Sequence, residues 1–209
     1  MKTPGSYNTG RSRTRQLTLA SAIAALYALL VSVLPATSIP IIQVRIADVL
    51  MPLSILFGWP AVIGVTIGAG LGNLVGDTLL GNPGSVTGVD VVFGSLANFV
   101  ASFLAWKISN RSWTIRGVRA SWIVAVNSET IVIALVVGSY LGWLFSIPLL
   151  ISIAGILVGS IIAISIAGYT LLLILSQERT LDSLRSTGLV VGASRPLEAL
   201  PSKLDPAQL

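Results

Sequence analysis

The sequence predicts an all-α integral membrane protein, with six transmembrane helices and both termini in the cytoplasm. Three observations predict it: an excess of apolar residues, a shortage of charged residues, and apolar runs long enough to cross a bilayer. The 209 residues are 54% hydrophobic and only 10% charged, whereas a soluble domain carries roughly 25% charged residues. A chain of this size cannot bury so much apolar surface in one core, so the excess must face the lipid of a cell membrane.

Six apolar segments divide the chain, and each is predicted to form one membrane-spanning helix. Their continuous apolar character favours helices over a barrel, whose strands would alternate apolar and polar residues. The segments lie at 17–34, 46–57, 61–75, 91–106, 120–144 and 149–175. The second and third are shorter than the roughly 20 residues of a perpendicular span, so a re-entrant pair of short helices is the alternative.

The distribution of Lys and Arg favours six full spans, because basic residues are retained on the cytoplasmic side of short loops. With six spans, twelve of the thirteen basic residues are cytoplasmic, four in each of three segments, and only Arg45 lies outside. The sequence therefore predicts a basic cytoplasmic tail at 1–16, a membrane domain at 17–175 and a flexible cytoplasmic tail at 176–209. These positions also explain the net charge of +5 without a nucleic-acid partner.

The residue types that are missing limit the chemistry. The chain has no Cys and no His, which excludes thiolate chemistry and the usual ligands of zinc and haem. We predict no catalytic residue, no metal site and no cofactor. No phosphate-binding Gly/Lys loop is present, so active transport would require partner ATPases. A membrane enzyme or accessory subunit with a carboxylate-held magnesium ion, and a small channel or carrier, are the alternatives.

Three alanines of the first predicted helix, Ala20, Ala24 and Ala28, are spaced by four residues. This spacing places them on one face of the helix, one above the next. Because small faces let helices approach closely in lipid, such a strip docks a second helix. That helix could belong to a partner subunit or to the same chain.

A polar group, Gln43, Arg45 and Asp48, lies at the outer end of the second predicted helix. Charged residues are costly within a bilayer, so they form a salt bridge or face a ligand. Arg45 and Asp48 are three residues apart, a spacing that permits a local salt bridge on a helix. We keep both interpretations.

Further polar residues lie near the third and fourth predicted helices. Asn73 and Asn98 fall within apolar runs, where an amide bonds a neighbouring helix or a ligand. A loop rich in Gly follows, with a Pro, and ends at Asp90, which we expect at the N-terminus of the fourth helix. The loop is predicted to be the longest outer connection, and it could close over a site or simply connect two helices.

Asn127 and Glu129 lie well inside the fifth predicted span. An intramembrane carboxylate is expected to face the interior of the bundle, as a ligand-binding group or as a protonated partner of another helix. Residues two apart diverge by about 200° around a helix. Both side chains therefore cannot point at one site unless the helix is distorted.

Three motifs resemble the QueT group of substrate-binding (S) components of energy-coupling-factor (ECF) transporters. The first comprises Gln43, Arg45, Ile46, Asp48 and Leu50; the second Gly64, Gly68, Gly72 and Asn73; the third Asp90, Phe93, Gly94, Ser95 and Leu96. The resemblance covers about residues 17–175. The sequence differs from the group's pattern at Asp48, where Glu is more frequent, and at 159–160, where Gly-Ser replaces an expected Gly-Glu.

The resemblance implies a six-helix subunit that binds a vitamin-like solute outside the cell, a queuosine precursor of the deazaguanine class. It also implies docking on a transmembrane coupling subunit driven by two ATPases, through the alanine face of the first helix. The residues expected to bind the solute are Gln43, Arg45, Asp48, Asn73, Asp90, Asn127 and Glu129. Donors of the ring and any ammonium substituent would bond carboxylates and amides.

Overall fold

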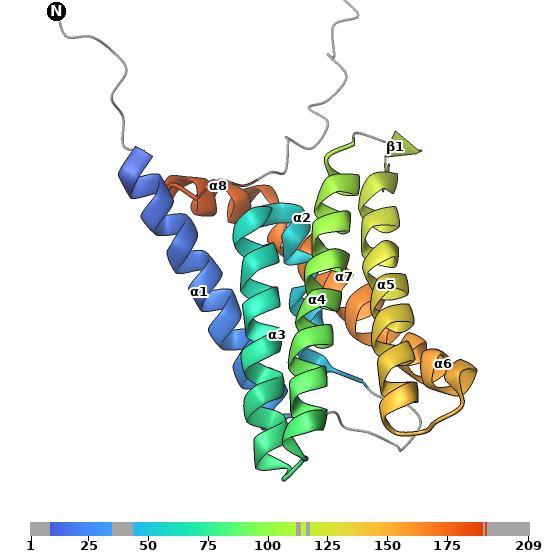
Figure 1. The fold of residues 1–209 in the computed structure, drawn as a ribbon. Helices are drawn as coiled ribbons and strands as arrows, with labels where there is room; N and C mark the ends of the chain where they lie inside the picture. Colours follow the sequence, from blue (N-terminus) through green and yellow to red (C-terminus); the bar gives the residue numbers. More distant parts are fainter. Residues whose placement is uncertain (1–8, 35–43, 112–113, 116–117, 190, 192–209) are drawn as a thin grey trace, which may run out of the picture.

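The protein folds into a bundle of helices (Figure 1). The computed structural model describes residues 9–34, 44–111, 114–115, 118–189 and 191. Among them, five helices are long and apolar enough to cross a membrane. They are α1 (Thr9–Val33), α3 (Trp59–Leu79), α4 (Gly84–Ser109), α5 (Ala120–Leu144) and a final helix formed by α6 (Leu149–Ser160), the π-helical η2 (Ile161–Gly168) and α7 (Tyr169–Leu175). The prediction of an all-α membrane protein is confirmed at this level.

The helices pack in the order of the chain. Contacts join α1 to α3, α3 to α4, α4 to α5 and α5 to α6, so that these helices stand side by side (Figure 1). Their outward faces carry large exposed apolar side chains, such as Leu71, Val92 and Leu135. Exposed apolar side chains on several helices suit a lipid environment.

The second predicted span is the shortest, and it lies inside the bundle. It consists of the 3₁₀ helix η1 (Ile46–Leu50) and α2 (Leu53–Phe57), separated by Met51 and Pro52. These elements contact α1, α3, α4 and η2, and nearly all of their residues are buried. Pro52 has no backbone N–H and cannot donate a helical hydrogen bond, so the regular pattern is interrupted there although Met51 and Pro52 both keep helical backbone angles. Irregular backbone is tolerated at membrane depth where protein rather than lipid surrounds it.

Close packing of α1 on α3 comes from two matching strips of small residues. A Cβ atom added to Gly64 would lie 2.9 Å from the carbonyl oxygen of Ala20, and one added to Gly68 would lie 2.8 Å from that of Ala24. Ala20 and Ala24 are buried in this contact, whereas Ala28 is partly exposed. The alanine strip therefore packs largely within the chain, which is one of the two interpretations of its spacing.

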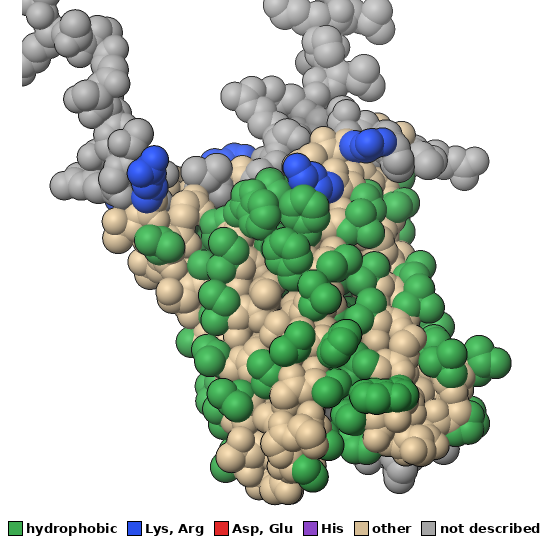
Figure 2. Space-filling view, viewed as in Figure 1, with side chains coloured by type: hydrophobic (Ala, Val, Ile, Leu, Met, Phe, Trp, Pro, Cys, Tyr) green, Lys and Arg blue, Asp and Glu red, His purple; other side chains and the backbone are tan. Residues whose placement is uncertain are grey.

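One end of the bundle gathers the basic side chains. Figure 2 shows Lys and Arg at the end where α1 begins and α8 (Glu178–Ser186) lies. A short antiparallel hairpin, β1 (Thr114–Ile115) and β2 (Val118–Arg119), joins α4 to α5. Near it, the rings of Trp59 and Trp106 lie 5.3 Å apart, and Nζ of Lys107 lies 4.9 Å from the Trp106 ring. Aromatic and basic residues of this kind mark a membrane interface, and we refer to this end as the basic end.

The structure differs from two expectations, one about the connection between α3 and α4 and one about the C-terminal segment. The helix that carries Asp90 starts at Gly84, directly after Pro83, so Asp90 lies in its second turn and not at its N-terminus. The connection from α3 to α4 is therefore short, because a proline fits the start of a helix and the following Gly residues are held within it. The region predicted as a flexible tail begins with α8, and Leu181 of this helix is buried.

Candidate functional site

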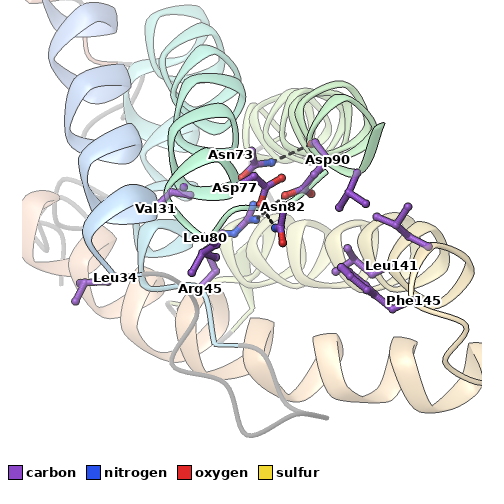
Figure 3. A pocket seen from close by; sticks show the side chains of 13 residues that line it. Val31, Leu34, Arg45, Asn73, Asp77, Leu80, Asn82, Asp90, Leu141 and Phe145 are labelled. Carbon is purple, nitrogen blue, oxygen red and sulfur yellow. Dashed lines mark hydrogen bonds and ion pairs between the residues drawn. The ribbon is translucent and has the colours of Figure 1, made fainter. Parts of the chain in front are cut away.

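A cavity of about 390 Å³ opens at the end of the bundle opposite the basic end, and Figure 3 shows the side chains that line it. It lies between the last turns of α1, α3 and α5 and the first turns of α4. Its volume falls within the range of small-molecule sites, about 300–1,000 Å³. Apolar residues at the ends of α1, α3, α4 and α5 complete its wall, and the polar residues that line it are Arg45, Asn73, Asp77, Asn82 and Asp90.

Arg45 and Asp90 form an ion pair across this cavity. The Nη2 atom of Arg45 lies 3.9 Å from Oδ2 of Asp90, which exceeds hydrogen-bond distance. The other carboxylate oxygen of Asp90 accepts a hydrogen bond from the hydroxyl of Tyr140 on α5. The local bridge between Arg45 and Asp48 is not the ion pair that forms, because Arg45 precedes η1 and reaches the carboxylate on α4.

Asn73 joins α3 to α4 beside this ion pair. Its Nδ2 atom donates to the backbone oxygen of Asp90 at 2.9 Å, and its side chain is almost fully buried. Its Oδ1 atom is also buried and finds no hydrogen-bond partner in the described part of the chain. Gly94 makes the close approach feasible, since a Cβ atom there would lie 2.5 Å from Nδ2 of Asn73.

Asp77 lies one helical turn beyond Asn73 on α3. Its Oδ1 atom accepts a hydrogen bond of 3.0 Å from Nδ2 of Asn82, which lies in the connection between α3 and α4. Its Oδ2 atom is buried, and no described residue bonds it. Residues four apart share one face of a helix, so Asn73 and Asp77 present two unsatisfied acceptors to the same cavity (Figure 3).

Asp48 lies deeper, in a separate hydrogen-bonded cluster. The hydroxyl of Tyr27 donates to Oδ1 of Asp48 and accepts a hydrogen bond of 2.7 Å from Nδ2 of Asn98. Asn98 follows Asp90 by eight residues on α4, a rise of about 12 Å. All three side chains are buried, so this cluster ties α1, η1 and α4 together below the cavity.

Glu129 is also buried, at still greater depth. Its Oε1 atom accepts a hydrogen bond of 3.0 Å from Ser54 of α2, and its Oε2 atom has no partner. Glu129 and Tyr140 are eleven residues apart on α5, a separation of about 16 Å along the axis. Since Tyr140 bonds Asp90 at the cavity, Glu129 faces the interior of the bundle well below the cavity.

The remaining predicted residues lie elsewhere. Asn127 is exposed on the outer face of α5, where its Nδ2 atom donates to the backbone oxygen of Ile123. It diverges from Glu129, as the spacing of two requires. Gln43 lies outside the described residues. The structure thus brings Arg45, Asn73 and Asp90 together in one cavity, and it places Asp48 and Glu129 beneath them.

Sequence reasoning did not include three cavity or cluster residues among the candidates: Asp77, Asn82 and Tyr27. Asp77 could have been found from its spacing of four from Asn73, which predicts a shared helix face. The tyrosine could not, because its partner Asp48 is 21 residues away and no local pattern links them. Tyr140 is a further residue that the sequence did not single out as a candidate, and the structure makes it the hydrogen-bond donor to Asp90.

Comparison with known proteins gives one match that covers most of the chain. The family model described as QueT transporter matches residues 17–177. No curated protein and no solved structure matches the chain. The matched range contains most of α1, all of the other long helices, and every residue of the cavity and of the two deeper clusters. The chain therefore belongs to the QueT transporter family.

Proposed function

We propose that the chain is the substrate-binding S component of an ECF importer, a subunit without catalytic activity. It captures a vitamin-like solute of the deazaguanine class, a queuosine precursor, from outside the cell. The observation that carries the proposal is the cavity of about 390 Å³, in a protein of the QueT transporter family. An ion pair and two unsatisfied acceptors line this cavity, and buried polar atoms without partners favour a ligand that supplies them.

The proposal retains Arg45, Asn73 and Asp90 as ligand-binding residues and adds Asp77. Asp48 and Glu129 belong to the deeper clusters, where they hold α1, η1, α2 and α5 together. Asn127 is left out because its side chain lies on the exposed face of α5. Gln43 precedes Arg45 by two residues and stays a candidate from sequence alone.

The proposed topology has six crossings, with both termini in the cytoplasm and the cavity facing outside. The two ends of the second span lie beside two positions on α4. Arg45 lies beside Asp90. Gly58 lies against Trp106, because a Cβ atom added to Gly58 would be 2.9 Å from Nε1 of Trp106. Asp90 and Trp106 are sixteen residues apart on α4, about 24 Å along the axis. The segment from Arg45 to Gly58 therefore covers most of a hydrocarbon core of about 30 Å, and the basic end is cytoplasmic by the positive-inside rule.

A screen of purified protein tests the proposed ligand class. We expect deazaguanine bases to raise the unfolding temperature, and thiamine or riboflavin to leave it unchanged, because only a ligand of the folded state stabilises it. At a ligand concentration of a hundred times Kd, the stabilisation is about 2.7 kcal/mol. Right-side-out membrane vesicles should bind the base, whereas sealed inside-out vesicles should not. A vitamin that stabilises the protein in place of the bases would contradict the cargo, and binding only to inside-out vesicles would contradict the topology.

Transport requires a transmembrane coupling subunit and two ATPases as partners, and we propose that the coupling subunit docks on α1. Ala20 and Ala24 are covered by α3, so the available surface lies next to them. Ser21, Ala25 and the partly exposed Ala28 form a shoulder of small residues on the lipid-facing side of the strip. A shoulder of small residues permits close approach of a partner helix.

Two leucine substitutions one residue apart test this docking surface. Ala25→Leu should reduce ATP-dependent uptake severalfold or more and leave the free energy of unfolding within about 0.5 kcal/mol, because Ala25 is an exposed position. Ala24→Leu should destabilise the fold by about 1–3 kcal/mol, since Ala24 packs against Gly68 without free space. Ligand binding by the isolated Ala25→Leu subunit serves as the control. Normal uptake by this variant would rule out the shoulder as the docking surface.

A further inference from the structure

The charged groups that line the cavity do not balance. They are Arg45, Asp77 and Asp90 among the described residues. The guanidinium of Arg45 is paired with Asp90, and Tyr140 donates to the same carboxylate. Asp77 is left with one neutral donor among the residues that the structure describes, the amide of Asn82. Within the described part of the chain, no cation is therefore left to pair with the carboxylate of Asp77.

The atoms that lack partners lie on the same side of the cavity as this charge. Oδ2 of Asp77 and Oδ1 of Asn73 are both buried, and neither has a hydrogen-bond partner among the described residues. Asn73 is only 2% exposed, and its one amide nitrogen is already used by the backbone of Asp90. Both atoms accept hydrogen bonds and cannot donate them. A ligand group that satisfies them must carry several N–H donors, and a positive charge would offset that of Asp77.

We infer that the ligand carries a primary or secondary ammonium group, with Asp77 as its counter-ion and Oδ1 of Asn73 as a second acceptor. This inference rests on the proposed function and narrows the substrate class within it. A deazaguanine with an aminomethyl substituent offers such a group at neutral pH. A deazaguanine with a nitrile substituent at the same position offers only an acceptor, which would face two further acceptors and leave the carboxylate unpaired.

The inference predicts selectivity between two bases that differ only in this substituent. Isothermal titration of the purified full chain with 7-aminomethyl-7-deazaguanine and 7-cyano-7-deazaguanine gives the two Kd values directly. We expect the aminomethyl base to bind at least about tenfold more tightly, in line with the greater strength of charge-assisted hydrogen bonds. In Asp77→Asn the affinity for the aminomethyl base should fall by about tenfold or more, while that for the cyano base stays the same or improves.

Two further variants serve as a control for the loss of a carboxylate and as a substitute if Asp77→Asn does not fold. Asp182→Asn removes a carboxylate from α8 at the basic end, where the side chain is 75% exposed, and should bind both bases like the native chain. Asn82→Ala retains the carboxylate of Asp77 and removes its neutral donor, so the preference for the aminomethyl base should persist even if Asp77→Asn does not fold. Equal affinity for the two bases, or a preference that survives in folded Asp77→Asn, would overturn the inference alone. If neither base binds the folded native chain, the inference and the proposed cargo both fail.

Discussion

Replacement of Gly68 by alanine is expected to destabilise the bundle by about 1–3 kcal/mol, the usual cost of inserting an atom into a packed contact. The added Cβ atom would lie 2.7 Å from Cβ of Tyr27 and 2.8 Å from the backbone oxygen of Ala24. Neither atom is the end of a flexible side chain, so α1 itself would have to move away from α3. That shift would also displace the hydroxyl of Tyr27 from Asp48.

Gly88→Ala is the matched control for this prediction. Gly88 is an exposed glycine within α4, and a Cβ atom added there meets no other atom within 4 Å. The same substitution should therefore stabilise the protein by about 0.5–1 kcal/mol, because alanine loses less conformational freedom in a helix than glycine. Reversible unfolding in detergent micelles measures both effects. Equal stability changes in the two variants would mean that α1 and α3 are not packed as closely as the structure describes.

The helices could be predicted from the sequence because lipid requires long apolar segments that bond their own backbone. Each of the five long helices falls on a predicted segment, and the alanine strip is visible in the sequence. What remained open was which helix the alanine strip contacts. Small residues at a spacing of four are compatible with any close neighbour, and only the tertiary structure selects Gly64 and Gly68.

The main error in the predicted connections was the long loop expected before Asp90, and the glycines and proline of this segment caused it. The residues between Leu80 and Asp90 contain three glycines and a proline, and such residues favour turns in water. In the structure Gly84 and Gly88 are part of α4, because Pro83 starts a helix that neighbouring helices then stabilise by packing. Tertiary contacts outweigh the weak local preference of single residues.

The sequence predicted which types of residue form the site, but it did not predict which of them form ion pairs and hydrogen bonds with one another. Arg45, Asn73 and Asp90 were chosen because charged and amide groups near or within apolar segments need a partner or a ligand. Local spacing permitted a salt bridge between Arg45 and Asp48, which was one of two interpretations. The partners are instead Asp90 on α4 for the arginine and Tyr27 on α1 for Asp48. Partners that are distant in the sequence cannot be deduced from helical periodicity.

Arg45→Met is expected to abolish ligand binding and to lower the stability of the folded chain. The substitution leaves Asp90 in a largely buried position with Tyr140 as its donor but without a counter-ion. Loss of one partner from a buried pair costs about 3–5 kcal/mol. Because the side chains of Arg45 and Asp90 are 24% and 13% exposed, solvent screening reduces the expected cost to about 1–3 kcal/mol.

A double-mutant cycle separates the structural and binding contributions of this ion pair. Arg45→Met combined with Asp90→Asn removes both charges, so it should regain part of the stability lost in the single variant, with an interaction free energy of about 1–2 kcal/mol. Ligand binding should not return with stability, because the guanidinium that we place against the ligand is still missing. If the double variant binds deazaguanines as tightly as the native chain, the pair only holds η1 to α4 and the ligand lies elsewhere. The outcome therefore decides whether Arg45 contacts the ligand or serves the fold alone.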